Sequence, residues 1–205
     1  MLKPNSALRT EAYAALQGNW LMAAVTTLIN MAVAAILGNI PWIGWIAVIL
    51  IGPVLGWGLY MVFYDLFREH KLVINTLFGG FNDYKRVLGT MLLVQVYTFL
   101  WTLLLIVPGI IKGCSYAMTP FILREHPELS YNAAIEKSMA MMEGNKMKFF
   151  LLCLSFIGWA ILCLLTLGIG YLFLYPYIYT SFVAFYEDLK AQQGEAVIVN
   201  TPQTE

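Results

Sequence analysis

The chain contains six long apolar stretches separated by short polar or uncharged connectors. They lie near residues 19–38, 43–67, 87–107, 109–124, 148–166 and 171–189. A helix needs about 20 residues to span roughly 30 Å of hydrocarbon, and most of the stretches approach that length. The sequence therefore predicts an all-α polytopic membrane protein with about six transmembrane helices.

Basic residues gather at one kind of boundary between these stretches. All but one of the 12 Lys and Arg residues lie at ends that six crossings would bring to the same side of a membrane. The connectors near Pro41, Pro108 and Gly168 carry no charge, and Lys112 is the single exception. The positive-inside rule then predicts a cell-membrane protein with both termini in the cytoplasm and with Asn39 and Gly168 outside.

Composition agrees with lipid as the main solvent. Hydrophobic residues make up 60% of the chain and charged residues 12%, whereas soluble domains carry about 25% charged residues. The net charge of zero gives no reason to expect nucleic acid as a partner. The hydrophobic composition instead leads us to expect membrane lipids as partners. We expect one integral membrane domain over residues 1–190, followed by a flexible cytoplasmic tail over residues 191–205.

The three cysteines lie inside apolar stretches and lack metal-ligand spacing. They are Cys114, Cys153 and Cys163. Such residues behave as small buried hydrophobes, so neither a disulfide framework nor a metal site is expected from them.

Short motifs recur where stretches return to the predicted cytoplasmic side. Residues 67–70 (Phe-Arg-Glu-His) resemble residues 123–126 (Leu-Arg-Glu-His), and residues 63–66 resemble residues 185–189. A segment with helical potential precedes each outgoing stretch. The inferred unit is a short surface helix, an outgoing helix, a tight external turn and a returning helix, written three times. The fold expected is thus three repeated helical hairpins.

Two of the surface segments have amphipathic patterns. The first places Leu8, Ala12, Ala15 and Leu16 on one side, and the third places Ile135, Met139 and Met142 at i, i+4 and i+7. Such helices can lie in the headgroup layer. The middle segment, residues 74–86, contains Gly79-Gly80 and Asn82-Asp83 and is less convincingly helical.

The returning stretches contain the residues that predict irregular geometry. Pro53 and Pro176 lack an amide donor, so each is expected to mark a kink or a helix start. Gly52, Gly56 and Gly58 are expected to let neighbouring backbones approach closely.

Three motifs in this order resemble the bacterial domain-of-unknown-function 975 family of integral membrane proteins. They are Gly18-Asn19-Trp20, residues 138–146 ending in Glu143-Gly144-Asn145-Lys146, and Pro176-Tyr177 running into residues 185–189. The resemblance covers most of residues 5–190. It implies a multi-helix membrane fold and no agreed activity.

Five residues are candidates for contact with a ligand or lipid: Lys112, Asn30, Gln95, Thr98 and Ser115. Lys112 near the outer end of its stretch can meet a lipid phosphate or extend its stem to the headgroups. Asn30 and Gln95 can bind a ligand or form hydrogen bonds between helices. No Asp or Glu lies near the middle of a stretch, which argues against an ion-coupled transporter.

Catalytic motifs are not recognisable. His70 and His126 lie near several acidic residues but lack the His-Glu-x-x-His spacing of a zinc enzyme. Neither a phosphate-binding glycine loop nor a Ser-His-Asp arrangement is evident. We therefore expect a non-catalytic protein without a metal or cofactor.

Two functions remain open at this point. One is a scaffold that engages other membrane proteins or organises lipid. The other is a cavity between the hairpins that binds or passively transports a lipid-like or small amphipathic molecule. The two differ in whether polar residues and glycines surround a cavity or are used for packing.

Overall fold

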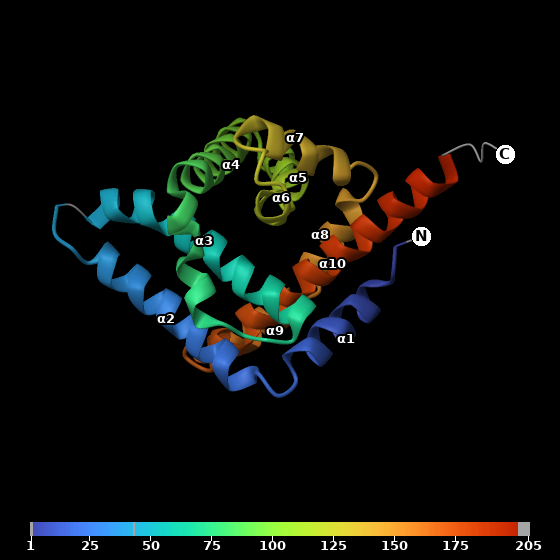
Figure 1. Cartoon of the computed structure of the whole chain (residues 1–205). Coiled ribbons are helices and arrows are strands. Elements are labelled where there is room, and N and C mark those ends of the chain that lie inside the picture. The colour runs from blue at the N-terminus through green and yellow to red at the C-terminus, as the bar shows by residue number, and fades with distance from the viewer. Residues whose placement is uncertain (1, 43, 201–205) are drawn as a thin grey trace.

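The computed structural model describes residues 2–42 and 44–200, with side chains up to residue 194, and within these ranges it contains helices and no strand (Figure 1). The elements in chain order are α1 (Asn5–Leu16), α2 (Trp20–Gly38), α3 (Gly44–Glu69), the 3-10 helix η1 (Ile74–Asp83), α4 (Tyr84–Leu104), α5 (Ile106–Tyr116), α6 (Thr119–Glu125), α7 (Asn132–Met141), α8 (Lys146–Leu154), α9 (Ile157–Leu165) and α10 (Tyr171–Asn200).

Five helical segments within the described part of the chain are long and apolar enough to cross a membrane. They are Trp20–Gly38, Gly44–Glu69, Ile74–Leu104, Ile106–Glu125 and Lys146–Leu165. The predicted all-α class is thereby confirmed, and the helices are compatible with a membrane location.

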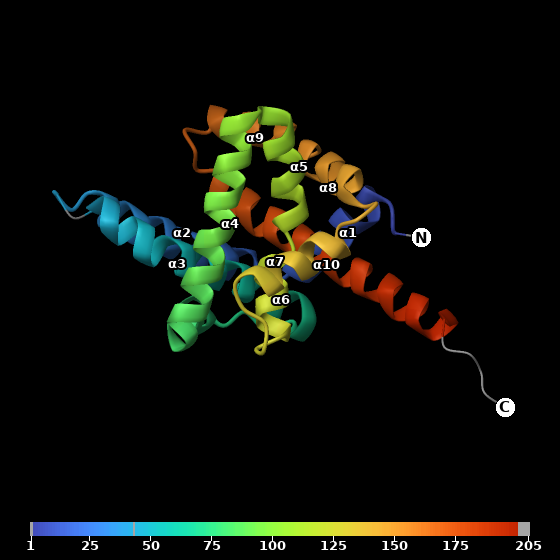
Figure 2. The same cartoon turned by 90° about the horizontal axis from the view of Figure 1, so that it is seen from above.

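Three helix pairs diverge from a common centre. α2 packs against α3, α4 against α5, and α9 against α10, while α3 and α10 also contact each other. Figures 1 and 2 show that α2 and α3 point in a different direction from α4 and α5. The pairs therefore meet near the centre of the molecule and move apart toward the turns that join the two helices of each pair.

The short helix α1 packs along α10. Leu8, Ala12 and Leu16 are fully buried, as the predicted apolar side requires. The backbone amide of Lys3 donates a hydrogen bond to Asp188 Oδ2 at 2.8 Å, which fixes one end of α1 to α10.

The 3-10 helix η1 crosses α3 at Gly58. A Cβ atom at this position would lie 1.9 Å from the carbonyl oxygen of Leu77, so only glycine allows the two backbones to approach this closely. Gly58 therefore has the packing role expected from the sequence.

The predicted helices over residues 109–124 and 148–166 are each divided in two. The first is α5 and α6, and the second is α8 and α9. At the first break, the buried Ser138 hydroxyl of α7 donates to the Ser115 carbonyl at 2.8 Å and accepts from the Met118 amide at 3.2 Å. A side chain distant in sequence thus satisfies the backbone groups that the break exposes.

The buried face of α7 is wider than the predicted stripe. Ala134, Ile135, Ser138 and Met141 are buried, whereas Met139 is only partly buried. Ser138 belongs to this face because its hydroxyl serves the break between α5 and α6.

Pro53 and Pro176, each expected to mark a kink or a helix start, both lie inside continuous helices, so neither marks a helix start, and a kink at either stays a prediction. In membrane helices a neighbouring helix can compensate for the disturbed backbone. The Tyr84 hydroxyl of α4 donates to the Leu50 carbonyl at 3.1 Å, one residue beyond the Ile49 carbonyl that Pro53 deprives of its amide donor. Pro108 lies in the first turn of α5, where its missing amide costs little.

Helix α10 continues to Asn200, beyond the predicted domain boundary at residue 190. Residues 201–205 of the predicted tail lie outside the described residues. Flexibility of the tail remains a prediction.

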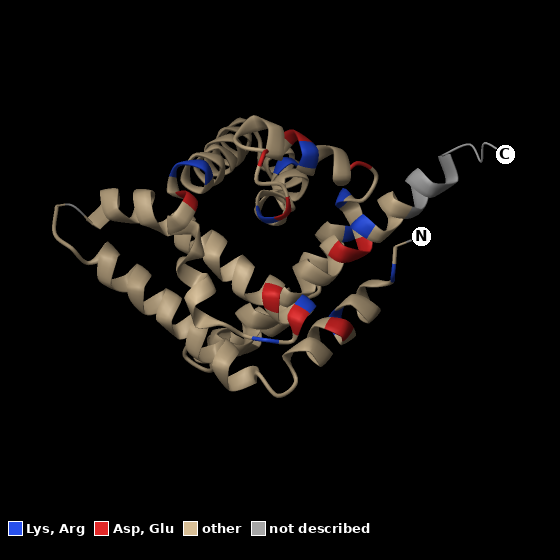
Figure 3. Cartoon of the chain, viewed as in Figure 1, with Lys and Arg blue, Asp and Glu red and all other residues tan. Residues whose placement is uncertain are grey.

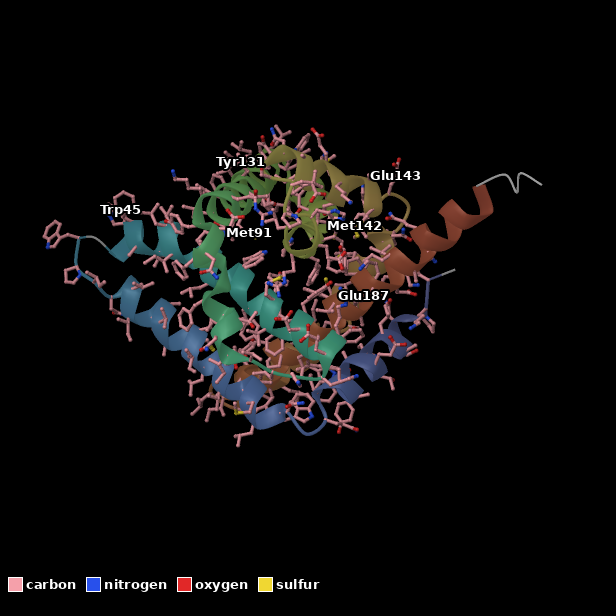
Figure 4. The ribbon with its side chains drawn as sticks, viewed as in Figure 1. Trp45, Met91, Tyr131, Met142, Glu143 and Glu187 are labelled. Atoms are coloured by element: carbon pink, nitrogen blue, oxygen red, sulfur yellow. The ribbon has the colours of Figure 1, made fainter. Side chains whose placement is uncertain are left out.

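Apolar side chains are widely exposed near the turns of the helix pairs. Trp42 is 94% exposed and Leu167 is 95% exposed, which suits a surrounding of lipid. Figure 3 shows no charged residue along α2. Figure 4 shows Trp45 beside the turn between α2 and α3, at the end of the molecule away from the N-terminus. Charge is concentrated toward the opposite ends of the helices.

Candidate functional site

A cavity of about 590 Å³ lies where the three helix pairs meet. Residues of α3, α4, α5, α6, α8 and α10 line it, together with Ala117 between α5 and α6, and most of them are apolar. Trp57 and Met91 belong to its wall, and Figure 4 shows Met91 in the interior of the molecule. Binding pockets for small organic ligands commonly have volumes of about 300–1,000 Å³ and apolar linings.

Glycines leave space in this cavity. Gly52 and Gly56 of α3 and Gly113 of α5 belong to the lining. A Cβ atom at Gly56 would meet nothing within 4 Å, and one at Gly113 would meet only Thr98 Cγ2 at 3.7 Å. The expectation that Gly52 and Gly56 permit close backbone contact is therefore wrong, since a Cβ atom at Gly52 would meet only the Val48 side chain of its own helix, at 3.8 Å, and one at Gly56 would meet nothing within 4 Å.

Two polar side chains in the cavity lack hydrogen-bond partners. Gln95, an exposed residue, and Tyr60, a partly buried one, line the cavity, and neither side chain forms a hydrogen bond within the described part of the chain. The Tyr60 ring is held by edge-to-face contacts with Phe121 and Tyr179, at centroid distances of 5.6 and 4.5 Å. An apolar space thus contains one amide and one phenol available to a bound molecule.

Other polar groups of the lining are already paired. The Thr98 hydroxyl donates to the Val94 carbonyl of its own helix at 2.7 Å. The Trp57 indole N–H donates to the Pro120 carbonyl at 3.0 Å, which links α3 to α6. The lining also contains Tyr116, whose side chain is hydrogen-bonded to that of Trp101. These groups shape the wall, and Gln95 and Tyr60 remain as the amide and phenol without a partner.

The cavity brings together Gln95 and Thr98 of the five predicted contact residues. The Lys112 ammonium lies 5.1 Å from the centroid of the Trp101 ring, outside the cavity lining. The Ser115 hydroxyl donates to the Ile111 carbonyl at 2.9 Å, and Asn30 is partly buried on α2. Neither of these two residues lines the cavity.

Sequence reasoning missed Tyr60 and misread Gly56. The available signal was the spacing of Gly52, Gly56 and Tyr60, which recur every four residues and so share one face of α3. That spacing is equally typical of tightly packed helices, so the sequence alone predicts close packing at these glycines.

A charged junction forms one turn beyond the cavity, around Glu125 at the end of α6. Glu125 Oε1 accepts from the Tyr64 hydroxyl at 2.5 Å, from Arg68 Nη1 at 3.0 Å and from Lys190 Nζ at 2.5 Å. Its other oxygen, Oε2, accepts from the Tyr186 hydroxyl at 2.8 Å. One carboxylate therefore joins the C-terminal ends of α3 and α6 to the middle of α10.

The donors to Glu125 have the same spacing on two helices. Tyr64 and Arg68 lie four residues apart on α3, and Tyr186 and Lys190 lie four residues apart on α10. Each cation also lies over the ring of its tyrosine, at 5.4 Å for Arg68 and 5.5 Å for Lys190. The likeness of residues 63–66 to residues 185–189 thus corresponds to equivalent contacts in space.

A polar cleft of about 740 Å³ adjoins the junction between α3 and α6. Arg124 and Asp65 approach to 3.4 Å across it. His126 contacts Glu128 at 2.9 Å and Lys137 at 2.6 Å. Hydrogen bonds from its own backbone amide and from His126 lower the pKa of the Glu128 carboxyl. The charges of this region are largely satisfied by one another.

The fold and the cavity define a helical protein suited to a membrane. The model of a family described as "Protein of unknown function (DUF975)" matches residues 102–193. The family resemblance inferred from the sequence motifs is thereby confirmed over this part of the chain. No curated protein and no solved structure matches the chain.

Proposed function

We propose that the chain is a membrane protein that binds a lipid-like or small amphipathic molecule in its central cavity. The observation that carries this proposal is the pair of unpartnered polar groups, Gln95 and Tyr60, in an otherwise largely apolar space of about 590 Å³. An amphiphile covers the apolar wall and supplies hydrogen-bond partners to these groups. The lining contains no charged side chain, so nothing in it compensates the charge of an ion in the way that carboxylates of ion-coupled transporters do.

The proposal includes six membrane crossings arranged as three repeated hairpins, with α10 providing the sixth crossing. α1, η1 and α7 each precede an outgoing helix, as a repeat requires. Gly18 and Gly144, at equivalent places after α1 and α7, both have positive φ angles, of 81° and 75°. The paired contacts of Tyr64 and Tyr186 with Glu125 also support the repeat.

The proposed orientation has both termini in the cytoplasm of a cell membrane. Figures 1 and 2 place the N-terminus and the end of α10 away from the turns of the helix pairs. Single cysteines at Asn39 and Lys190 test the orientation by labelling in intact cells. Position 39 is expected to react at once and position 190 only after permeabilisation, and the reverse order would overturn the orientation.

The scaffold function has less support. A scaffold would also engage partners through its charged cytoplasmic face, and there Arg68, Glu125 and Lys190 are already paired with one another within the chain. The cavity, by contrast, offers groups without partners. Binding of an amphiphile is therefore the function that the geometry favours.

The test compares two glycine substitutions by native mass spectrometry of protein purified in mild detergent. Gly56→Leu fills the cavity, and Gly158→Leu on α9 is the matched control, because a Cβ atom at either glycine meets nothing within 4 Å. Wild type and Gly158→Leu are expected to retain a bound amphiphile, whereas Gly56→Leu loses about tenfold in affinity. Equal retention by all three proteins, or none by the wild type, would overturn the proposal.

A further inference from the structure

A second apolar space opens beside the central cavity, between α5 and α8. It measures about 430 Å³ and is lined by residues of 107–114 and 146–150. Ile110, Cys114 and Phe150 line both spaces, so the groove and the cavity share a wall. We call this space the α5–α8 groove.

The outer walls of the α5–α8 groove face the surroundings of the protein. Val107 is 65% exposed, Ile111 is 47% exposed and Met147 is 67% exposed. Because these side chains are apolar, their exposure fits contact with the bilayer rather than with water. The groove is thus a side opening toward lipid.

Lys146, the first residue of α8, is the one charged residue that lines the groove. Its side chain forms neither an ion pair nor a hydrogen bond within the part of the chain that the structure describes. Lys190 binds Glu125 and Lys112 lies over the Trp101 ring. The other lysines without an ion pair or a side-chain hydrogen bond in the described part of the chain are Lys71, Lys85 and Lys148, and none of these lines the groove. An unpaired ammonium beside an apolar groove complements a phosphate attached to acyl chains.

We propose that the α5–α8 groove is a lateral entrance for an anionic glycerophospholipid. Lys146 binds the lipid phosphate while an acyl chain lies along the groove and reaches the central cavity at Ile110 and Phe150. This inference rests on the proposed function and names the class of its ligand. Charge complementarity at Lys146 and the shared wall of the two spaces carry it.

The test measures lipid preference of the whole chain in mixed vesicles or nanodiscs. Phosphatidylglycerol and phosphatidylcholine with identical acyl chains compete for the protein, and bound lipid is quantified by native mass spectrometry. Wild type is expected to prefer phosphatidylglycerol. Lys146→Gln is expected to reduce that preference about tenfold while leaving phosphatidylcholine binding unchanged, and Lys146→Arg to retain it.

Lys112→Gln and Lys148→Gln are the matched controls, because each removes one lysine that does not line the groove. Both are expected to keep the wild-type preference. An undiminished preference in Lys146→Gln, or a loss in Lys112→Gln instead, would overturn the inference and leave amphiphile binding standing. Absence of both lipids from the wild type would overturn the proposed function together with it.

Discussion

The central cavity and the charged junction use similar side chains in opposite ways. Tyr60 and Tyr64 lie one turn apart on α3, yet the Tyr60 hydroxyl faces the cavity without a partner while the Tyr64 hydroxyl binds Glu125 at 2.5 Å. At the junction, four side chains donate hydrogen bonds to the single carboxylate of Glu125. We infer that polarity alone does not distinguish a binding site, and that the unpaired polar groups of the cavity set it apart from the junction.

Glycines of α3 show the same contrast. Gly58 touches η1, where a Cβ atom would lie 1.9 Å from the Leu77 carbonyl oxygen, and Gly56 borders the cavity with nothing within 4 Å. Of these two glycines, which are separated by one residue, Gly58 allows close packing against η1 and Gly56 leaves space in the cavity.

The largest expected effect is that of Gly58→Ala. The added methyl group meets a backbone carbonyl that cannot move without shifting η1, so the free energy of unfolding should fall by about 3 kcal/mol. Thermal unfolding in detergent measures this, with Gly56→Ala as control. A comparable loss in Gly56→Ala would remove the distinction between the two glycines.

Glu125→Gln should have the next largest effect. The substitution leaves Arg68 and Lys190 without their carboxylate, although both cations are partly exposed, with side-chain exposures of 48% and 32%. We expect a loss of about 2 kcal/mol in unfolding free energy. Bound amphiphile should be retained, because the junction lies outside the cavity lining. Loss of the amphiphile from a folded Glu125→Gln variant would show that the cavity and the junction act as one site.

A smaller effect separates the two tyrosines directly. Tyr64→Phe removes a hydrogen bond to a charged acceptor and should cost about 1 kcal/mol in stability. Tyr60→Phe removes an unpartnered hydroxyl, so stability should stay within about 0.5 kcal/mol while affinity for the amphiphile falls. Stability changes of the same size in both variants would contradict the assignment of Tyr60 to a binding site.

The sequence predicted the helical class and much of the local pattern for clear physical reasons. Hydrophobic length sets membrane crossings, and periodicity predicted the buried side of α1, with Leu8, Ala12 and Leu16 fully buried. The break between α5 and α6 was not predictable in this way, because Ser138 satisfies its backbone groups from 20 residues beyond Met118.

The candidate site was predictable only in part. Gln95 and Thr98 stood out as polar residues in an apolar stretch, and both line the cavity. Tyr60 did not stand out, because a tyrosine in a membrane helix also fits an interfacial belt. The convergence on Glu125 needed the relative placement of three helices, which local sequence does not contain.

Quenching of tryptophan fluorescence by a brominated amphiphile tests the central claim most directly. Trp57 lines the cavity and is only 5% exposed, whereas Trp159 is 54% exposed, so only the second should meet the bulk bilayer. Two variants are compared, each retaining one of these tryptophans and carrying Phe at the other five tryptophan positions. Quenching of Trp57 is expected to be saturable and to be reversed by an unbrominated amphiphile in competition, whereas quenching of Trp159 is expected to be non-saturable. Trp57 fluorescence that the brominated amphiphile leaves unchanged, while Trp159 is quenched, would contradict a ligand-binding cavity.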